Sequence, residues 1–169
     1  MLRLLIAMVP VLLLCSPGAA AQDVEALERQ LEQARDAAPM VVKPFTASTR
    51  KAKYFGDYEP RKGNEFKRGE EIVFYGELKN LTFKKNAQGV FEPAFEVDLE
   101  VKALKDGKTM SQPKVMNFKL PTRSRVQDLF LNLSLSLDQA PPGNYNVKFV
   151  IRDLNSKKSA VASQDITLK

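Results

Sequence analysis

Hydrophobic and polar residues alternate along most of the chain between Glu71 and the C-terminus. From Phe95 to Val101 every second residue is apolar, and each residue between them is acidic. From Leu129 to Leu137 leucine occupies every second position. Because successive side chains of a strand point to opposite faces, this period of two predicts β-strands with one buried and one exposed face.

Turn sequences of hairpin length separate these runs. Residues 106–107 (Asp-Gly), 141–143 (Pro-Pro-Gly) and 153–156 (Asp-Leu-Asn-Ser) are typical of tight connections. After the first turn we expect a strand over about 108–120. Since Pro113 has no amide hydrogen to donate, this strand is expected at the edge of a sheet or at a bulge.

Short connections join the strands, with neither helices nor long crossovers between them, so the sheets are expected to be antiparallel. A further short strand near Lys53–Asp57 brings the expected number to about seven. One exposed and one buried face per strand favours two sheets that pack together. We therefore expect an all-β, antiparallel two-sheet sandwich. A closed barrel is the alternative, because periodicity does not distinguish the two.

Residues 23–38 follow a different pattern, with apolar residues at steps of three and four. This spacing predicts a short helix with one narrow apolar stripe. Asp23 is suited to cap its start, and Pro39 is expected to end it. A helix of this length is marginal by itself, so it packs on the domain, pairs with a partner helix, or stays a frayed N-terminal arm. The stripe consists of Val24, Leu27, Leu31 and Ala34.

The chain begins with the parts of a secretory signal peptide. Arg3 precedes an apolar run from Leu4 to Cys15, and Ala19-Ala20-Ala21 follows it. The run is too short to span a bilayer, so we expect cleavage after Ala21 and a periplasmic or secreted protein. A retained membrane anchor is one alternative. Lipidation of Cys15 is another, which the large Leu14 disfavours because that modification needs a small residue before the cysteine.

The expected organisation is a signal peptide over residues 1–21, a short helical arm over 22–40 and a β-sandwich domain over 41–169. Within the domain, residues 41–70 are expected to form an irregular, basic lead-in. No second apolar stretch has membrane length. The cleaved chain is therefore not expected to be an integral membrane protein.

The composition excludes several classes of chemistry. The chain has no histidine, and its one cysteine, Cys15, lies in the expected signal peptide. The usual ligand sets for zinc, copper and haem need these residues, as do cysteine nucleophiles and Ser-His-Asp triads. We expect no cofactor and no enzymatic activity; a hydrolase with a carboxylate or Ser-Lys site is the weakest alternative. Secretion without disulfides favours a bacterial envelope.

Calcium is the metal that remains open, since it takes oxygen ligands alone. Glu96, Asp98 and Glu100 form an acidic row along one strand face. No calcium-binding loop sequence gathers them around one ion. A solvated strand face that discourages edge-to-edge aggregation is therefore the favoured interpretation, with a weak calcium site as the alternative.

A basic, aromatic segment between residues 50 and 68 is the candidate for partner binding. Positive side chains beside exposed rings hold acidic protein surfaces, anionic polymers or lipid head groups. The alternative is that these charges solubilise a first strand whose rings enter the core. We expect another envelope protein or an anionic envelope polymer as partner, and no nucleic acid, because of the export signal and a net charge of only +6. The candidate contact residues are Arg50, Lys51, Lys53, Tyr58, Arg61, Lys62, Lys67 and Arg68.

The stretch from Leu137 to Val147, with Pro141-Pro142-Gly143-Asn144-Tyr145 at its centre, is similar to the corner before the sixth strand of immunoglobulin-like and fibronectin-type-III-like sandwiches. The resemblance implies a structural role for Tyr145, whose hydroxyl would bond to an upstream main-chain group. The cysteine pair and the tryptophan of antibody domains are absent. It therefore implies only the broad sandwich class.

A second pattern resembles uncharacterised bacterial exported proteins that carry one such sandwich. It consists of Tyr58-Glu59-Pro60-Arg61 followed by Asn64, Phe66, Gly69-Glu70 and Tyr75. The resemblance implies no activity. Together the two resemblances cover roughly residues 54–169.

The sequence leads to one main functional hypothesis, a non-catalytic periplasmic or secreted binding or adaptor module. The sandwich would be its scaffold, the 50–68 segment its contact surface and the helix a docking or pairing element. The alternative is a structural envelope protein that self-associates, through the helix or by adding strands edge to edge.

Overall fold

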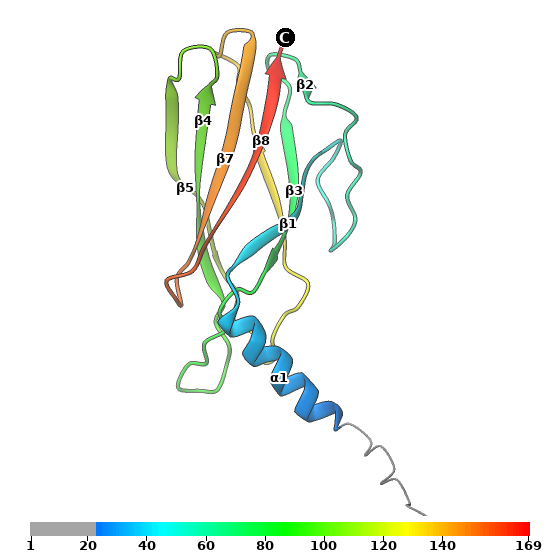
Figure 1. Ribbon diagram of the computed structural model, residues 1–169, viewed down its shortest axis with the longest axis vertical. Helices are drawn as coiled ribbons and strands as arrows, with labels where there is room; N and C mark the ends of the chain where they lie inside the picture. The colour runs from blue at the N-terminus through cyan, green and yellow to red at the C-terminus, as the bar shows by residue number, and fades with distance from the viewer. Residues whose placement is uncertain (1–22) are drawn as a thin grey trace, which may run out of the picture.

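A computed structural model describes residues 23–169, which form one helix and eight strands (Figure 1). The predicted signal peptide and its cleavage site lie outside the described residues. The helix α1 spans Val24–Ala37, close to the predicted range. The strands are β1 (Val41–Ser48), β2 (Glu65–Phe66), β3 (Ile72–Lys79), β4 (Ala94–Ala103), β5 (Thr109–Lys119), β6 (Phe130–Leu135), β7 (Gly143–Asp153) and β8 (Ser159–Leu168).

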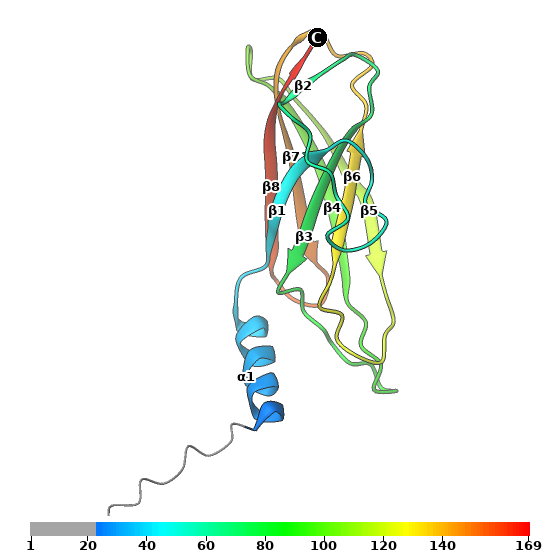
Figure 2. The same cartoon turned by 90° about the vertical axis from the view of Figure 1, so that its right-hand side faces the viewer.

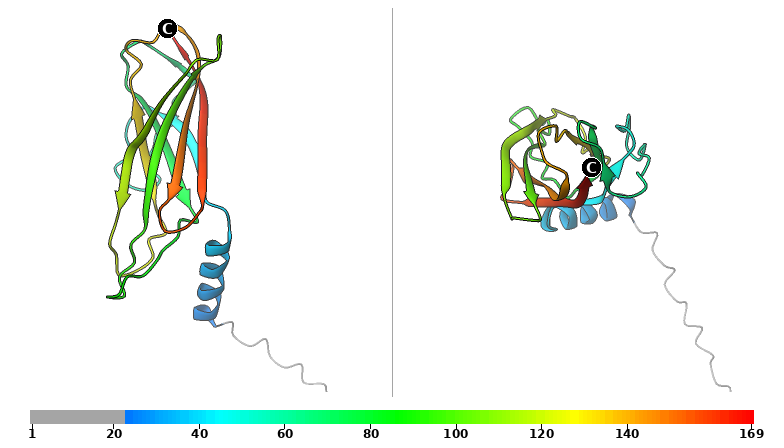
Figure 3. Two further views of the ribbon diagram at one scale, coloured as in Figure 1. Left: turned by 90° about the vertical axis from the view of Figure 1, so that its left-hand side faces the viewer. Right: turned by 90° about the horizontal axis from the view of Figure 1, so that it is seen from above.

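The strands form two sheets, of order β1-β3-β6 and β2-β8-β7-β4-β5. All neighbouring pairs are antiparallel except β2 and β8. The expectation of an all-β, two-sheet architecture is thus confirmed. Figure 3 shows the same domain from another side and along its long axis.

Two expectations about individual strands are wrong. The described residues form eight strands rather than about seven, because the lead-in expected to be irregular contains two strands, β1 and the two-residue β2. The alternation of β1 is interrupted by a register shift between Val42 and Phe45, which hides the period of two. The strand expected near Lys53–Asp57 is a loop, which turns at Gly56 with a positive φ of 79°.

The core lies between the sheets and is made by the inward residues of the alternating strands. Val97, Val147 and Ile151 from the larger sheet are completely buried. Phe74 of β3 meets Phe149 of β7 edge to face, with ring centroids 5.8 Å apart. Each sheet therefore buries one face against the other, as the alternation predicts.

The strand that contains Pro113 forms the edge of the larger sheet, as expected. Its partner β4 shows a register shift between Val97 and Leu99, opposite this point. Lys114 adopts a positive φ of 54°, and its amide donates to Asp98 Oδ1 at 2.8 Å. Proline and bulge together interrupt the β5 edge in mid-strand.

The two long sides of the sandwich differ. On one side β1 lies against β8, where the Ala47 amide donates to Gln164 Oε1 at 3.1 Å. On the other side stand β5 and β6, each hydrogen-bonded to one neighbour only. Figure 2 shows β1 and β8 along one side and β5 and β6 along the other. The sandwich is therefore closed on the first side and open on the second.

α1 lies beyond the end of the sandwich that is opposite the C-terminus (Figure 1). Asp23 caps it by accepting a hydrogen bond from the Glu25 amide at 3.0 Å. Its apolar stripe is not covered by the domain, since Val24 is 67% exposed and Leu31 is 50% exposed. No helix among residues 23–169 is long and apolar enough to cross a membrane.

Candidate functional site

The first half of the predicted basic segment forms a loop, residues 49–58, that covers the outer face of the smaller sheet. The Tyr58 ring stacks on Tyr75 of β3 with centroids 4.2 Å apart. The Gly56 amide donates to the Tyr75 hydroxyl at 2.8 Å. Phe130 of β6 stacks on the other flank of Tyr75, 6.0 Å away. Tyr58 and Phe130 thus belong to a small aromatic cluster that buries Tyr75 completely.

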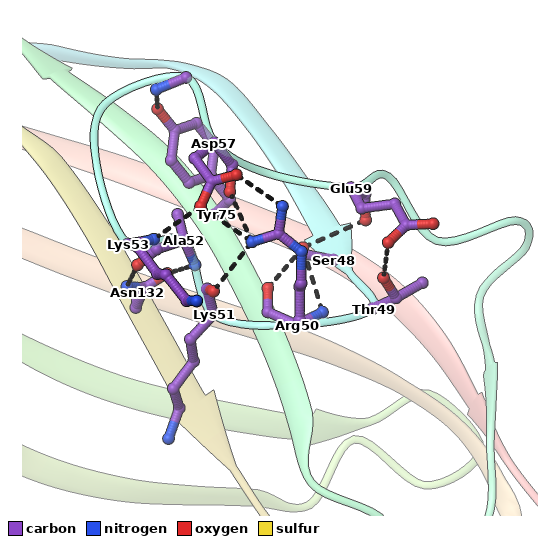
Figure 4. Close-up of polar contacts among 11 residues, drawn as sticks. Ser48, Thr49, Arg50, Lys51, Ala52, Lys53, Asp57, Glu59, Tyr75 and Asn132 are labelled. Atoms are coloured by element: carbon purple, nitrogen blue, oxygen red, sulfur yellow. Dashed lines mark hydrogen bonds and ion pairs between the residues drawn. The ribbon is translucent and has the colours of Figure 1, made fainter.

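Arg50 fastens this loop from within (Figure 4). Its guanidinium donates to both carboxylate oxygens of Asp57, at 2.9 and 2.5 Å, and to the Asp57 main-chain oxygen at 3.2 Å. Asp57 also accepts from the Lys53 amide at 3.0 Å. The hydrogen bonds from Arg50, and then that from the Lys53 amide, lower the pKa of Asp57 to about 2.

Lys51 has an acidic partner as well, because its ammonium lies 2.7 Å from Glu71. The loop is tied to β6 by Asn132, whose side chain makes two hydrogen bonds with the main chain of Ala52, at 2.9 and 2.8 Å. Of the cations in this loop, Lys53 alone has an ammonium without an ion pair among residues 23–169.

The second half of the segment, residues 61–70, forms a loop around β2 that is also held from inside. Arg61 donates to Glu70 at 2.6 Å and to the Glu65 main-chain oxygen at 2.9 Å. Its guanidinium also lies 4.4 Å above the centre of the buried Phe66 ring. Glu70 accepts from the Lys67 amide at 2.9 Å, and this bond, followed by that from Arg61, lowers the pKa of Glu70.

Lys62, Lys67 and Arg68 point outward from the same loop; we call them the outer cations. All three are exposed, and no acidic side chain of residues 23–169 pairs with them. The main chain beneath them is anchored, since the Arg68 amide donates to the Lys169 oxygen at 3.1 Å and the Lys169 amide to the Phe66 oxygen at 2.8 Å.

The structure therefore divides the eight predicted contact residues into two groups. Arg50, Lys51, Arg61 and Tyr58 make intramolecular contacts, whereas Lys53 and the outer cations remain exposed. A signal for this division was present in the sequence, because Asp57, Glu70 and Glu71 lie within or next to the segment. The pairing between individual acidic and basic side chains depends on the geometry of the loops, which the spacing of residues in the sequence does not determine.

The acidic row on β4 is neutralised by cations of the neighbouring strands. Glu96 lies 3.0 Å from Lys114, Asp98 pairs with Arg152, and Glu100 pairs with Lys148. The hydrogen bond from Arg152, and then that from the Lys114 amide, lowers the pKa of Asp98 to about 2. Residues 23–169 contain no group of three or more side chains placed to hold a metal ion.

The open side of the sandwich forms a groove between β5 and β6, the β5–β6 groove. Its main part has a volume of about 680 Å³. A second hollow of about 480 Å³ continues it toward Tyr145 and shares Val101, Met110 and Leu137 with the first. This groove was not predicted from the sequence, because alternation predicts buried faces but not which sheet edges stay apart.

Near its C-terminal end, α1 is held to the domain by polar contacts. Arg125 donates to both carboxylate oxygens of Asp36, at 3.0 and 2.8 Å, and lies 3.6 Å from Glu32. The Lys158 ammonium donates to the Arg35 main-chain oxygen at 3.2 Å. A smaller hollow of about 230 Å³ lies between this end of the helix and the sandwich.

No protein-family model matches the chain, and no curated protein matches it. Three solved structures show remote likeness. A candidate superoxide reductase from Thermotoga maritima shares 10% identity at a TM-score of 0.45, over 79% of this chain and 89% of that one. The alkylpurine DNA glycosylase AlkC of Pseudomonas fluorescens, bound to DNA containing an abasic site analogue, shares 13% identity at a TM-score of 0.45. The match covers 85% of this chain and 37% of that one. The sulfur carrier protein SoxY of Chlorobium limicola f thiosulfatophilum shares 9% identity at a TM-score of 0.33, over 87% of this chain and 99% of that one. Likeness at this level assigns neither a family nor an activity.

Proposed function

We propose that the protein is a non-catalytic, periplasmic or secreted binding or adaptor module that contacts an anionic partner through its outer cations. The observation that carries the proposal is the division of charges in the 61–70 loop. Arg61 and Glu70 hold the loop inward, and Lys62, Lys67 and Arg68 extend from it without acidic partners among residues 23–169. A rigid loop that presents unpaired charge binds at a lower entropic cost than a flexible one.

The chemistry of these side chains favours an acidic protein surface or an anionic envelope polymer as the partner. Exposed ammonium and guanidinium groups attract such surfaces over several ångströms, and added salt screens the attraction. The expected export of the chain argues against nucleic acid. The lack of histidine in the whole chain supports a module without catalysis.

The scaffold is inferred to be of the immunoglobulin-like type. Supporting this inference, two antiparallel sheets pack face to face, and the Tyr145 hydroxyl donates to the Pro141 main-chain oxygen at 2.6 Å. The tyrosine corner of such sandwiches makes an upstream hydrogen bond of this kind.

The test is charge reversal of the outer cations with a matched control. Lys62→Glu, Lys67→Glu and Arg68→Glu are combined in one variant, and Lys84→Glu, Lys105→Glu and Lys157→Glu in another. The control lysines are also exposed and without an ion pair among residues 23–169, so both variants change the net charge equally. Arg61 is left intact, because its contacts with Glu70 and Phe66 stabilise the loop.

We expect the first variant to recover partner from detergent-free envelope extracts about tenfold less well, while the control recovers it normally. Both variants should unfold at the temperature of the parent protein. Equal recovery by both variants, or an equal loss in both, contradicts the proposal.

Self-association of a structural envelope protein is the second candidate, and the exposed stripe of α1 favours it. Val24, Leu27 and Leu31 are exposed, although apolar stripes of helices are normally buried. Leu27→Lys with Leu31→Lys should then convert an oligomer to a monomer in sedimentation experiments. A parent protein that is monomeric at every concentration removes this candidate.

A further inference from the structure

The β5–β6 groove is an incomplete part of the sandwich and lies apart from the outer cations. On this side the smaller sheet ends at β6 and the larger sheet ends at β5. The connection between them, residues 120–129, crosses from one sheet to the other and adds no strand. No strand therefore pairs with β6 on this side, and the groove follows β6 from Asn132 onward.

The floor of the groove is apolar. Phe149, Leu133 and Val101 form its base and are almost completely buried, while Met110 and Val115 on β5 are exposed above it. The polar residues in the lining of its main part are Ser111, Gln112, Asn132, Ser134 and Ser136, and none of them is charged. A charged side chain that entered this part would find no partner there.

The β6 edge offers main-chain hydrogen-bonding groups beside this floor. The Leu78 amide donates to the Leu129 oxygen at 3.0 Å, which fixes the alternation along the β3–β6 pair. In that alternation Leu131 and Leu133 bond to β3, whereas the amide and carbonyl groups of Asn132 and Ser134 point to the open side. An uninterrupted edge of this kind is a template for another strand.

The β5 edge is a poorer template. By the same reasoning, the Ala103 amide bonded to the Lys108 oxygen at 2.8 Å places the Ser111 main chain on the open side. Two residues further on, Pro113 has no donor and Lys114 has the positive φ of the bulge. Interruptions of this kind prevent pairing along the middle of a strand.

The apolar floor and the open main-chain groups of β6 favour an extended polypeptide, rather than an acyl chain, as the ligand of the groove. An acyl chain would cover the apolar floor but would leave the open groups of Asn132 and Ser134 bonded to water. A strand satisfies both, because alternate side chains reach the floor while its main chain bonds to the edge. The uncharged lining requires uncharged residues at those inward positions.

We propose that the β5–β6 groove binds an extended segment of another protein, about six residues long, which adds to β6 as a fourth strand of the smaller sheet. Alternate residues of the segment are apolar and fill the floor. The site is separate from the outer cations, so it stands or falls independently of the function proposed above.

The test uses a synthetic peptide as the probe, Lys-Val-Thr-Val-Thr-Val-Thr-Lys with both ends blocked. Binding is followed through the methyl NMR signals of Met110 and Met116, which line the groove. Met40, buried elsewhere in the core, serves as the internal control. We expect the first two signals to shift with saturation and the Met40 signal to stay in place.

Two proline variants identify the strand that accepts the peptide. Ser134→Pro removes an open amide of β6, and Ser111→Pro removes the corresponding one of β5; neither amide bonds within its sheet. Ser134→Pro should weaken peptide binding about tenfold, and Ser111→Pro should leave it within about twofold. The reverse order of effects overturns the assignment to β6.

Two further probes keep the proposal testable if Ser134→Pro does not fold. Peptides N-methylated at all valines or at all threonines block one hydrogen-bonding edge each, so one of them should fail to bind and the other should bind. Binding of both, binding of dodecanoate in preference to the peptide, or no binding at millimolar peptide overturns the proposal. So does a parent protein that already occupies the groove with a second copy of itself and releases it when peptide is added.

Discussion

At the scale of single residues, side chains that look alike in the sequence have different tasks in the structure. Arg50 and Arg61 hold loops from inside, while Arg68 is free of ion pairs within residues 23–169. Two tyrosines also differ: Tyr145 donates a hydrogen bond through its hydroxyl to the Pro141 oxygen, whereas Tyr58 stacks its ring on another tyrosine. Residue type predicted the chemistry of these groups but not their partners.

Tyr145→Phe tests the corner hydrogen bond. The substitution removes the hydroxyl that donates to the Pro141 oxygen at 2.6 Å and leaves the ring in the core. We expect a loss of about 1 kcal/mol in the free energy of unfolding, seen as a lower urea midpoint at an unchanged slope. Tyr54→Phe is the control, since Tyr54 is 65% exposed. Equal midpoints for Tyr145→Phe and the parent protein would show that the bond contributes nothing.

The lowered pKa of Asp57 predicts how the 49–58 loop responds to acid. Its folded-state pKa of about 2 lies below the ordinary 3.8, so its contribution to stability is complete above pH 4 and is lost as the pH falls toward 2. A carboxyl-carbon NMR titration should give a midpoint near 2, with the Lys53 amide signal moving together with it. Arg50→Ala should raise the midpoint toward 3.8, and Lys51→Ala should not. A midpoint near 4 in the parent protein contradicts the contact.

At the scale of elements, the sequence predicted those strands whose alternation is uninterrupted. β4 and β7 lie where the period of two placed them, and Pro113 correctly indicated an edge strand or a bulge, since β5 has both. β1 was not predicted, because a register shift after Val42 breaks its alternation of apolar and polar residues. The strand expected near Lys53–Asp57 is instead part of the 49–58 loop. Its rings Tyr54 and Phe55 are exposed, and only Tyr58 stacks on the outside of the smaller sheet.

The attachment of α1 depends on Arg125. Arg125→Ala removes two hydrogen bonds to Asp36 and the ion pair with Glu32. Hydrogen exchange of the amides near the end of α1 should then accelerate about fivefold, because the helix is marginal without its anchor. Arg29→Ala is the control, since its ion pairs with Asp23 and Glu25 lie within the helical arm itself. Unchanged exchange in Arg125→Ala would place the anchor elsewhere.

At the scale of the whole molecule, the predicted architecture was right in its two-sheet, all-β outline, whereas the candidate site was foreseen only in part. Charge clustering pointed to residues 50–68, and the structure leaves Lys53 and the outer cations exposed there. The β5–β6 groove had no sequence signal, since it depends on which strands end each sheet. Local patterns determine faces and edges of strands, while the pairing of distant strands decides which edges remain open.

Site-specific photo-crosslinking in the intact native envelope tests the central claim most directly. A photoreactive residue replaces Lys67 in one variant and Lys84, one of the three control lysines, in another. We predict that the first variant forms a discrete adduct with one partner and that the adduct disappears when Lys62 and Arg68 are also reversed in charge. Adducts of equal yield at both positions, or adducts of the first variant with copies of this chain alone, would contradict a binding module that acts through its outer cations.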